Sequence, residues 1–248
     1  MNKLKSTLVA LFLIPVVMNA QTFETDVLKS KKRNGKDITI TCIKHASLMI
    51  EHNGTRIYID PVSEYADYSK MPPADCIILT HQHSDHFDTV AIRHIVKSST
   101  KIVGNKECIE TLKKGLAMAY GDDVSLSSSI QIKAVAAYNT TKAHANFHPK
   151  GMGNGYVLTI DGTTIYIAGD TELIPEMKAL KGKIDVAFLP VNQPYTMTVE
   201  QAVKAAKLIA PKIFFPYHYG QVEEETDITA LVNELENTDI DVRVRQMQ

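Results

Sequence analysis

Two segments about a hundred residues apart resemble each other, and each has the pattern of a tight β-hairpin. Residues 48–59 are centred on an Asn-Gly dipeptide and residues 156–168 on an Asp-Gly dipeptide, and both dipeptides favour the positive φ angles of a two-residue turn. The second strands read GTRIYI and GTTIYI, and an aspartate closely follows each, Asp60 and Asp170. The repetition indicates an internally duplicated β-rich unit, the alternative being a chance match between two ordinary strand sequences.

Helical patterns lie between the strand-like runs, with apolar residues three and four positions apart. They cover residues 89–97, 105–118, 198–209 and 227–236. Thr198 followed by Gln201 has the spacing of a capping box, which marks the start of the third helix. Mixed strands and helices without a linker rich in Pro, Gly or Ser predict one α/β domain over residues 21–248.

The first twenty residues have the pattern of a secretory signal peptide. Two lysines lie within residues 1–5, an uncharged apolar run covers residues 8–17, and Ala20 precedes the predicted cleavage point. We therefore expect a periplasmic or secreted protein with no stable membrane insertion after cleavage. A short membrane anchor is the alternative reading of the same residues.

Charge and cysteine content narrow the chemistry further. A net charge of −1 provides no basic field for phosphates, so we expect no nucleic-acid partner. The three cysteines, Cys42, Cys76 and Cys108, have no C-x-x-C spacing, and we expect them to be small core residues. Any metal ligands must therefore be nitrogen and oxygen atoms.

A dense cluster of such ligands follows the apolar run CIIL at residues 76–79. Residues 81–88 contain three histidines and two aspartates. Neutral imidazole and carboxylate groups are preferred zinc ligands, and a loop at a strand end can direct alternate side chains toward one point. His81 and His83 can meet at one ion, while Asp85 and His86 emerge on the next turn and can reach a second ion. The pattern predicts a metal site.

The order His81-x-His83-x-Asp85-His86 after an apolar strand resembles the signature of the metallo-β-lactamase superfamily. The resemblance extends over nearly the whole chain after residue 20. It implies an αββα sandwich of two mixed β-sheets flanked by helices.

The resemblance also implies a set of metal ligands. One zinc ion would bind His81, His83 and His148, and a second would bind Asp85, His86 and His218, with Asp170 bridging the two. The residues themselves are compatible with these roles, because Asp170 and His218 each follow a strand-like run. His144 competes with His148 for the same role, and the Pro-Lys-Gly sequence after His148 favours the latter.

Two further residues are expected to assist the site. Asp60, within the sequence YIDP, resembles an aspartate that hydrogen-bonds a metal-binding histidine, although it could equally serve a β-turn before Pro61. His45 resembles the histidine in the Gly-His-Ala/Ser stretch of the L-ascorbate 6-phosphate lactonase-like branch, except that Lys44 replaces the glycine. We expect His45 to line the pocket, and His52 and His94 to lie on the surface.

The implied activity is hydrolysis by two zinc ions that lower the pKa of a shared water to near neutrality. Asp85, Asp170, His45 and Asp60 are the expected catalytic participants. Imidazole-rich sites also suit manganese and iron, but the set lacks the extra carboxylate associated with the di-iron branch of the superfamily, so zinc is the expected metal. The expected substrate is a small-molecule ester, lactone or phosphoester. A β-lactamase, a phosphodiesterase and a non-catalytic zinc-binding protein are the other readings, and the sequence leaves the oligomeric state open.

Overall fold

A computed structural model describes residues 21–220 and 225–248 of the chain. The predicted signal peptide, residues 1–20, lies outside these residues. The strands are β1 (Glu24–Leu28), β2 (Ile38–Lys44), β3 (Ser47–His52), β4 (Thr55–Ile59), β5 (Cys76–Leu79), β6 (Lys101–Gly104), β7 (Leu116–Ala117), β8 (Asp123–Ser127), β9 (Ile130–Ala137), β10 (Gly153–Ile160), β11 (Thr163–Ile167), β12 (Val186–Pro190), β13 (Ile213–Tyr217) and β14 (Asp241–Val242). The helices are η1 (Tyr68–Lys70), α1 (Thr89–Ile95), α2 (Lys106–Leu112), η2 (Pro175–Leu180), α3 (Val199–Ile209) and α4 (Ile228–Leu235).

The strands form two seven-stranded mixed sheets, the first built from β1 to β7 and the second from β8 to β14. Each sheet begins with three antiparallel pairings and continues with three parallel ones, in the same order along the chain. The two similar hairpins, β3–β4 and β10–β11, occupy equivalent positions in the two sheets. The topology therefore agrees with the predicted internal duplication.

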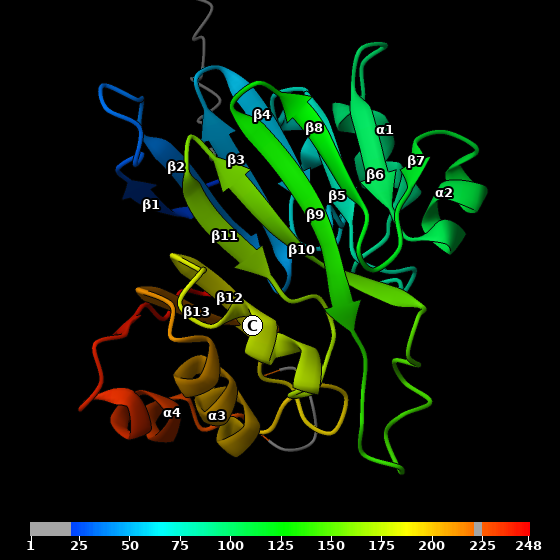
Figure 1. Cartoon of the computed structure of the whole chain (residues 1–248). Helices are drawn as coiled ribbons and strands as arrows, with labels where there is room; N and C mark the ends of the chain where they lie inside the picture. Colours follow the sequence, from blue (N-terminus) through cyan, green and yellow to red (C-terminus); the bar gives the residue numbers. More distant parts are fainter. Residues whose placement is uncertain (1–20, 221–224) are drawn as a thin grey trace, which may run out of the picture.

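The main core lies between the two sheets, where alternate residues of each strand face inward. Ile57 and Ile59 of β4 and Ile165 and Ile167 of β11 belong to this one cluster of buried residues. A second core lies on the other face of the first sheet, between Tyr58 and the buried faces of α1 and α2. Figure 1 shows α1 and α2 on one side of the sheets and α3 and α4 on the other. This arrangement is the predicted αββα sandwich.

Local signals account for the hairpins and helix starts. The turn residues Asn53 and Asp161 have φ angles of 50° and 45°, the left-handed conformation that such dipeptides favour. Thr198 and Gln201 form the predicted capping box at the start of α3. Within the described residues, no helix combines the length and apolar character that crossing a bilayer requires.

The helix predicted over residues 105–118 is wrong in its second half. Helix α2 ends at Leu112, Lys113 adopts a left-handed conformation, and the chain turns at Gly115 into the short strand β7. Gly115 has a φ of 118°, and a Cβ atom there would lie 2.8 Å from the carbonyl oxygen of Ile102. The glycine thus lets the chain pass close to β6. The apolar residues after it form the strand β7 and not a further helical turn.

The prediction that His52 lies on the surface is also wrong, whereas His94 is exposed as expected. Only 3% of His52 is exposed, and its Nε2 atom lies 3.0 Å from the carboxylate of Asp161. The end of one hairpin strand thus contacts the turn of the other hairpin. Packing between two sheets buries this histidine, which a single hairpin would leave in water. The three cysteines are free and buried, as predicted.

Candidate metal centre

The loop after β5 contains four of the predicted ligands. All four residues of β5 are buried, and its neighbours β4 and β6 run parallel to it. After His83 the chain makes a tight turn, in which the amides of His86 and Phe87 both donate to the carbonyl oxygen of His83. Asp88 then ends the loop by accepting a hydrogen bond from the amide of Val90 as the N-cap of α1. The turn and cap place His81 to His86 at the carboxyl end of the sheet.

His81, His83 and His148 form one group of ligand atoms, all within 4.8 Å of one another. The Nε2 atom of His81 lies 3.0 Å from Nδ1 of His83. His148 comes from the loop between β9 and β10, and its Nδ1 lies 3.0 Å from the carbonyl oxygen of Tyr195. Because a carbonyl oxygen only accepts, Nδ1 carries the hydrogen, and Nε2 of the neutral ring keeps its lone pair for the cluster.

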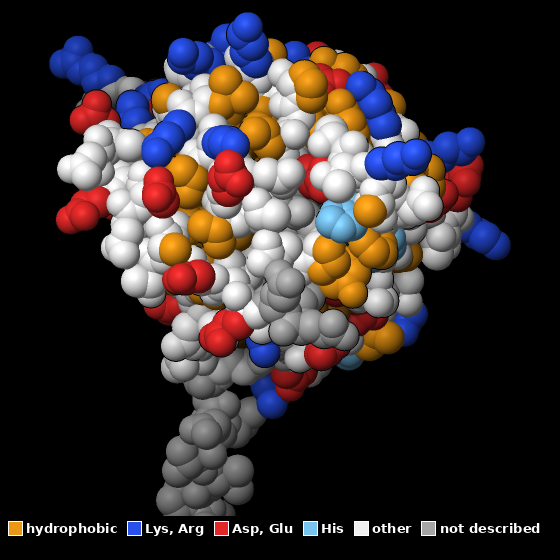
Figure 2. All heavy atoms as spheres, turned by 90° about the horizontal axis from the view of Figure 1, so that it is seen from below, with side chains coloured by type: hydrophobic (Ala, Val, Ile, Leu, Met, Phe, Trp, Pro, Cys, Tyr) orange, Lys and Arg blue, Asp and Glu red, His pale blue; other side chains and the backbone are white. Residues whose placement is uncertain are grey.

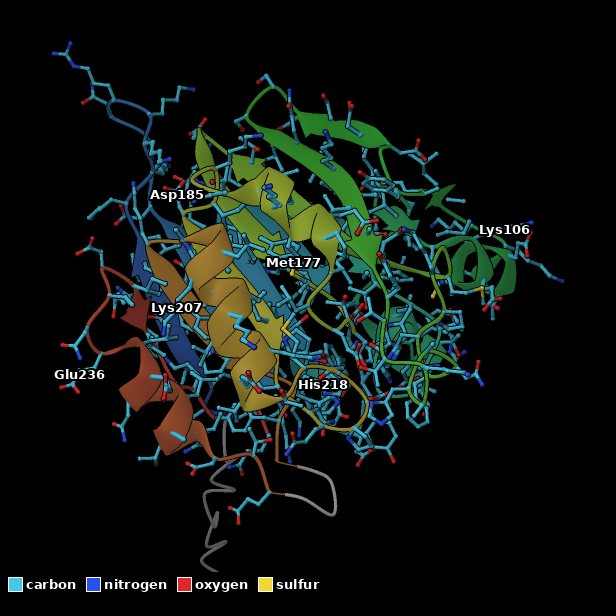
Figure 3. All side chains as sticks on the ribbon, turned by 60° about the horizontal axis from the view of Figure 1, so that its bottom comes forward. Lys106, Met177, Asp185, Lys207, His218 and Glu236 are labelled. Atoms are coloured by element: carbon cyan, nitrogen blue, oxygen red, sulfur yellow. The ribbon has the colours of Figure 1, made fainter. Side chains whose placement is uncertain are left out.

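A second group consists of His45, Asp85, His86 and His218. Nδ1 of His86 lies 2.8 Å from the Asp60 carboxylate, so its Nε2 faces His218 at an Nε2–Nε2 distance of 3.0 Å. His218 directly follows β13, and its backbone amide donates to the carbonyl oxygen of His45. Figure 3 shows His218 near the loops at one end of the sheets.

His45 occupies the turn between β2 and β3 with a φ of 56°. Its Nε2 atom lies 3.2 Å from the carboxylate of Asp85. His45 lines the pocket beside the site, as expected from the sequence, and the structure also places its Nε2 atom among those that could hold an ion.

Asp170 lies between the two groups. Its carboxylate oxygens lie 3.2 Å from Nε2 of His148, 3.2 Å from Nε2 of His86 and 3.3 Å from Nε2 of His218. The preceding Gly169 has a φ of 63°, and a Cβ there would lie 2.8 Å from the carbonyl oxygen of Asn154. The glycine thus permits the sharp turn that brings this carboxylate from the end of β11 into the cluster.

The electrostatics of the cluster favour cations. Burial raises the pKa of Asp170, but His218 and His86 outweigh that effect and hold the pKa well below its usual range. Burial also opposes protonation of His86 and His218, yet the Asp170 carboxylate outweighs it and raises the pKa of both. Burial lowers the pKa of His81 and leaves this ring neutral. Divalent ions entering the cluster would therefore displace protons from His86 and His218.

The donor set fits divalent metal ions. Nε2 of His148 is buried and makes no hydrogen bond within the described part of the chain. Oδ1 of Asp170 is also buried, and it lies 3.2 Å from Nε2 of His86. A buried acceptor without a partner costs about 1–3 kcal/mol, and coordination to a cation would remove that cost. Nitrogen and oxygen ligands in this ratio suit zinc and related transition metals.

The site opens into a pocket of about 330 Å³. Its lining residues are His45, His83, Asp85, Phe147, His148, Asp170, Asn192, Tyr195 and His218. The rings of Phe147 and Tyr195 lie with centroids 4.9 Å apart and are both partly exposed. Among the described lining residues there is no lysine or arginine. Figure 2 shows hydrophobic side chains next to histidine on this face of the molecule.

The structure separates His148 from its competitor His144. His144 lies outside both groups and approaches the carboxylate of Glu172 at 3.6 Å. Glu172 is buried and accepts hydrogen bonds from the backbone amides of Thr140 and Thr141, so it fixes the start of the loop that carries His148.

Three residues that surround the ligands were not predicted from the sequence. The side-chain amide of Asn192 lies 3.0 Å from Nδ1 of His218, and Tyr195 and Phe147 line the pocket. Asn192 lies just beyond β12, at the sheet edge that carries the other site residues. A polar residue after a fully buried parallel strand is a signal that could have identified it.

A family comparison covers all of these positions. The model of the Beta-lactamase superfamily domain matches residues 39–218, from β2 to the last predicted ligand. The chain belongs to the beta-lactamase superfamily. Within this superfamily it is 38% identical over 192 residues to a UPF0173 metal-dependent hydrolase of Ligilactobacillus salivarius, covering 73% of this chain and 84% of the relative. It is 32% identical over 183 residues to another from Nanoarchaeum equitans, covering 71% and 81%. The chain is thus a UPF0173 metal-dependent hydrolase.

Solved structures of similar proteins agree with this assignment. A candidate metal-dependent hydrolase of Parabacteroides distasonis shares 51% identity with this superfamily member at a TM-score of 0.86, covering 92% of this chain and all of the other. The metallo hydrolase Igni18 of Ignicoccus hospitalis shares 26% identity at a TM-score of 0.70, covering 84% and 94%. The predicted fold and the predicted hydrolase class are therefore confirmed.

Proposed function

We propose that this metal-dependent hydrolase is an exported enzyme that binds two zinc ions and hydrolyses small uncharged esters or lactones with an apolar substituent. The observation that carries the proposal is the position of Asp170. Its carboxylate lies within 3.3 Å of imidazole nitrogens from both ligand groups, where it can hold two ions at once.

Each residue has a distinct part in this proposal. His81, His83 and His148 would hold one ion, and Asp85, His86 and His218 the other, with Asp170 shared between them. Zinc supplies a water of lowered pKa and an electrophile for the scissile carbonyl. The Asp60 carboxylate and the Tyr195 carbonyl oxygen orient His86 and His148 by accepting their Nδ1 hydrogens.

His45 is placed to act on the second ion or beside it. Burial and the neighbouring His218 lower its pKa to about 4, so the ring is neutral at physiological pH. A neutral Nε2 at 3.2 Å from Asp85 can either ligate an ion or hydrogen-bond to a substrate held there.

The pocket lining supports the substrate class. Enzymes usually bind the phosphate or carboxylate group of a substrate through arginine or lysine side chains. The described lining residues contain neither. The aromatic pair Phe147 and Tyr195 provides an apolar wall beside the ligands. An ester or lactone with an apolar substituent would bury that substituent against the two rings and leave its carbonyl to the metal ions. The lining thus favours an ester or lactone without a phosphate group, in contrast to the phosphorylated lactone after which the branch resembled by the sequence is named.

Activity measurements on the zinc-loaded enzyme test the proposal. We expect turnover of γ-nonalactone and p-nitrophenyl butyrate, and lower kcat/KM for γ-butyrolactone, which lacks the apolar chain. Phe147→Ala should raise KM for γ-nonalactone several-fold and leave KM for γ-butyrolactone unchanged. Val244 is an exposed apolar residue outside the pocket, so the control variant Val244→Ala should change neither KM value. Preferred cleavage of bis(p-nitrophenyl) phosphate or of a cephalosporin would replace this proposal with a phosphodiesterase or β-lactamase. Two bound zinc ions without turnover on any of these substrates would indicate a zinc-binding protein.

Export is tested separately. N-terminal sequencing of the protein recovered from the host envelope should give a chain starting at Gln21, and an intact N-terminus at Met1 would contradict the cleavage.

A further inference from the structure

A second cavity, of about 330 Å³, lies on the outer face of the second sheet and shares no lining residue with the metal pocket. It is formed by β9, β10 and β11 on one side and by η2 and the segment before β12 on the other. Its lining residues are Tyr120, Lys133, Val135, Ala136, Val157, Thr164, Tyr166, Glu176, Met177, Ala179, Leu180, Lys183 and Ile184. Figure 3 labels Met177 where η2 lies against the strands. Small-molecule sites have volumes of about 300–1,000 Å³, so this cavity is large enough for a compact ligand.

We propose that this cavity binds a small apolar carboxylic acid that carries one further hydrogen-bond acceptor. Three features of the cavity lead to this ligand: an apolar floor, a buried hydroxyl group and two lysines, and none of these polar groups has a side-chain partner among the described residues.

The floor is apolar. Met177 and Ile184 are almost completely buried, and Val157 and Leu180 contribute partly buried side chains. Water in such a space finds few polar partners, and an apolar ligand would displace it favourably.

Tyr166 provides the hydroxyl group. The residue is completely buried, yet its OH makes no hydrogen bond within the described part of the chain. Tyr58 occupies the equivalent position in the duplicated half, and its OH donates to the carbonyl oxygen of Pro72 at 2.8 Å. A buried hydroxyl group without a partner is destabilising, so the difference between the two halves points to a ligand atom that accepts from Tyr166.

The lysines provide the charge. Neither Lys133 nor Lys183 forms an ion pair with a described residue, although Asp123 lies opposite Lys133 in the pairing of β8 and β9. The one carboxylate in the lining, Glu176, is already paired with Lys150 at 2.8 Å and accepts a hydrogen bond from Tyr138. Both lysines are exposed, so they place a positive charge at the mouth of the cavity, which a carboxylate would neutralise.

The strand pairing places these residues on one face of the sheet, within reach of one compact ligand. Lys133, Val157 and Tyr166 are directly opposite one another on the adjacent strands β9, β10 and β11. Adjacent strands are about 4.8 Å apart, so the lysine backbone and the tyrosine backbone are separated by about 10 Å. An aryl keto acid such as 4-oxo-4-phenylbutanoate has a carboxylate, a carbonyl acceptor and an apolar ring within that length.

Binding of 4-oxo-4-phenylbutanoate to the full chain, measured by calorimetry, tests the proposal. We expect equal affinity in zinc-loaded and EDTA-treated protein, because the metal centre is elsewhere. With [methyl-¹³C]methionine, the signal of Met177 should shift on binding, while that of Met197, which does not line the cavity, should not. Absence of binding, or binding that EDTA abolishes, would overturn the proposal.

Substitutions assign the two polar contacts. The double variant Lys133→Gln/Lys183→Gln should lose about 10-fold or more in affinity for the acid. Lys178 is an exposed lysine of η2 outside the cavity, so the control variant Lys178→Gln should bind the acid normally. Tyr166→Phe should lower the affinity for 4-oxo-4-phenylbutanoate about 2- to 10-fold. The affinity for 4-phenylbutanoate, which lacks the carbonyl, should stay unchanged. Equal effects of Tyr166→Phe on the two acids would contradict the hydrogen bond, and normal binding by the lysine double variant would contradict the carboxylate site.

Discussion

The carboxylate of Asp60 lies 2.8 Å from Nδ1 of His86, and both side chains are buried. Asp60 also accepts hydrogen bonds from the backbone amide and the hydroxyl group of Thr80. One carboxylate thus joins the end of β4, the end of β5 and a predicted metal ligand. Because it accepts the Nδ1 hydrogen, it directs Nε2 of His86 toward the centre of the cluster.

Asp60→Asn should lower the affinity for metal about 10- to 100-fold, because an amide cannot accept all three hydrogen bonds and no longer fixes the His86 ring. Competition with a zinc chelator measures the change. Asp88→Asn is the matched control, since Asp88 caps α1 and an asparagine retains that function. Unchanged zinc affinity in a folded Asp60→Asn protein would limit Asp60 to its role in the turn.

His148→Asn should reduce the bound zinc from two equivalents to one, because the first ion would keep only His81, His83 and the shared carboxylate of Asp170. Metal analysis after equilibrium dialysis gives the stoichiometry. His144→Asn, in the same loop but outside the cluster, should retain two equivalents. The reverse result would assign the ligand role to His144.

Removal of metal by EDTA should lower the melting temperature by about 10 °C, and zinc should restore it. A ligand present at about 1,000 times its Kd stabilises the native state by about 4 kcal/mol, and each kcal/mol corresponds to about 2–4 °C in a domain of this size. Calorimetry with and without zinc measures the shift. The Asp170→Ala protein should show a much smaller response to zinc, and a full response would argue against the shared carboxylate.

Asp185→Asn should destabilise the metal-free protein at pH 7 by about 1–3 kcal/mol. Burial raises the pKa of Asp185, but hydrogen bonds from Lys31, the Thr164 amide and Lys212 outweigh it and lower the pKa. A lowered pKa stabilises the folded state above the unfolded value of about 3.9, and that contribution is lost as the pH falls through the folded value.

The difference between wild type and Asp185→Asn should therefore shrink below about pH 4. Urea unfolding of both proteins in EDTA at several pH values measures it. A difference that stays constant down to pH 3 would show that the ion pairs with Lys31 and Lys212 contribute nothing to stability.

Local sequence was sufficient for the hairpins and most helix starts. The Asn-Gly and Asp-Gly turns and the capping box at Thr198 depend on residues only a few positions apart, so their geometry follows from local conformational preferences. The prediction failed over residues 113–118, where the same apolar spacing serves a turn and an edge strand. Pairing with β6 decided that conformation, and this contact is not visible in the local apolar spacing.

The sequence also could not predict which histidines are buried, because their burial depends on the tertiary structure. His52 ends a hairpin strand, a position that is exposed in an isolated hairpin, yet the turn at Asp161 of the other sheet covers it. Similarly, His45 and His218 are 173 residues apart in sequence, but their rings lie with centroids 3.7 Å apart.

By itself the sequence determined the kinds of ligand and their places at strand ends, because residue type and strand pattern are local properties. It also determined the duplicated order of strands through the two similar hairpins. The packing of the two sheets brings His148, which the sequence already favoured over His144, and Asp170 into one cluster, and only this packing decided that His45 lies beside Asp85. These outcomes depend on contacts between segments far apart in the chain, and such contacts form only when the hydrophobic faces of both sheets are buried together.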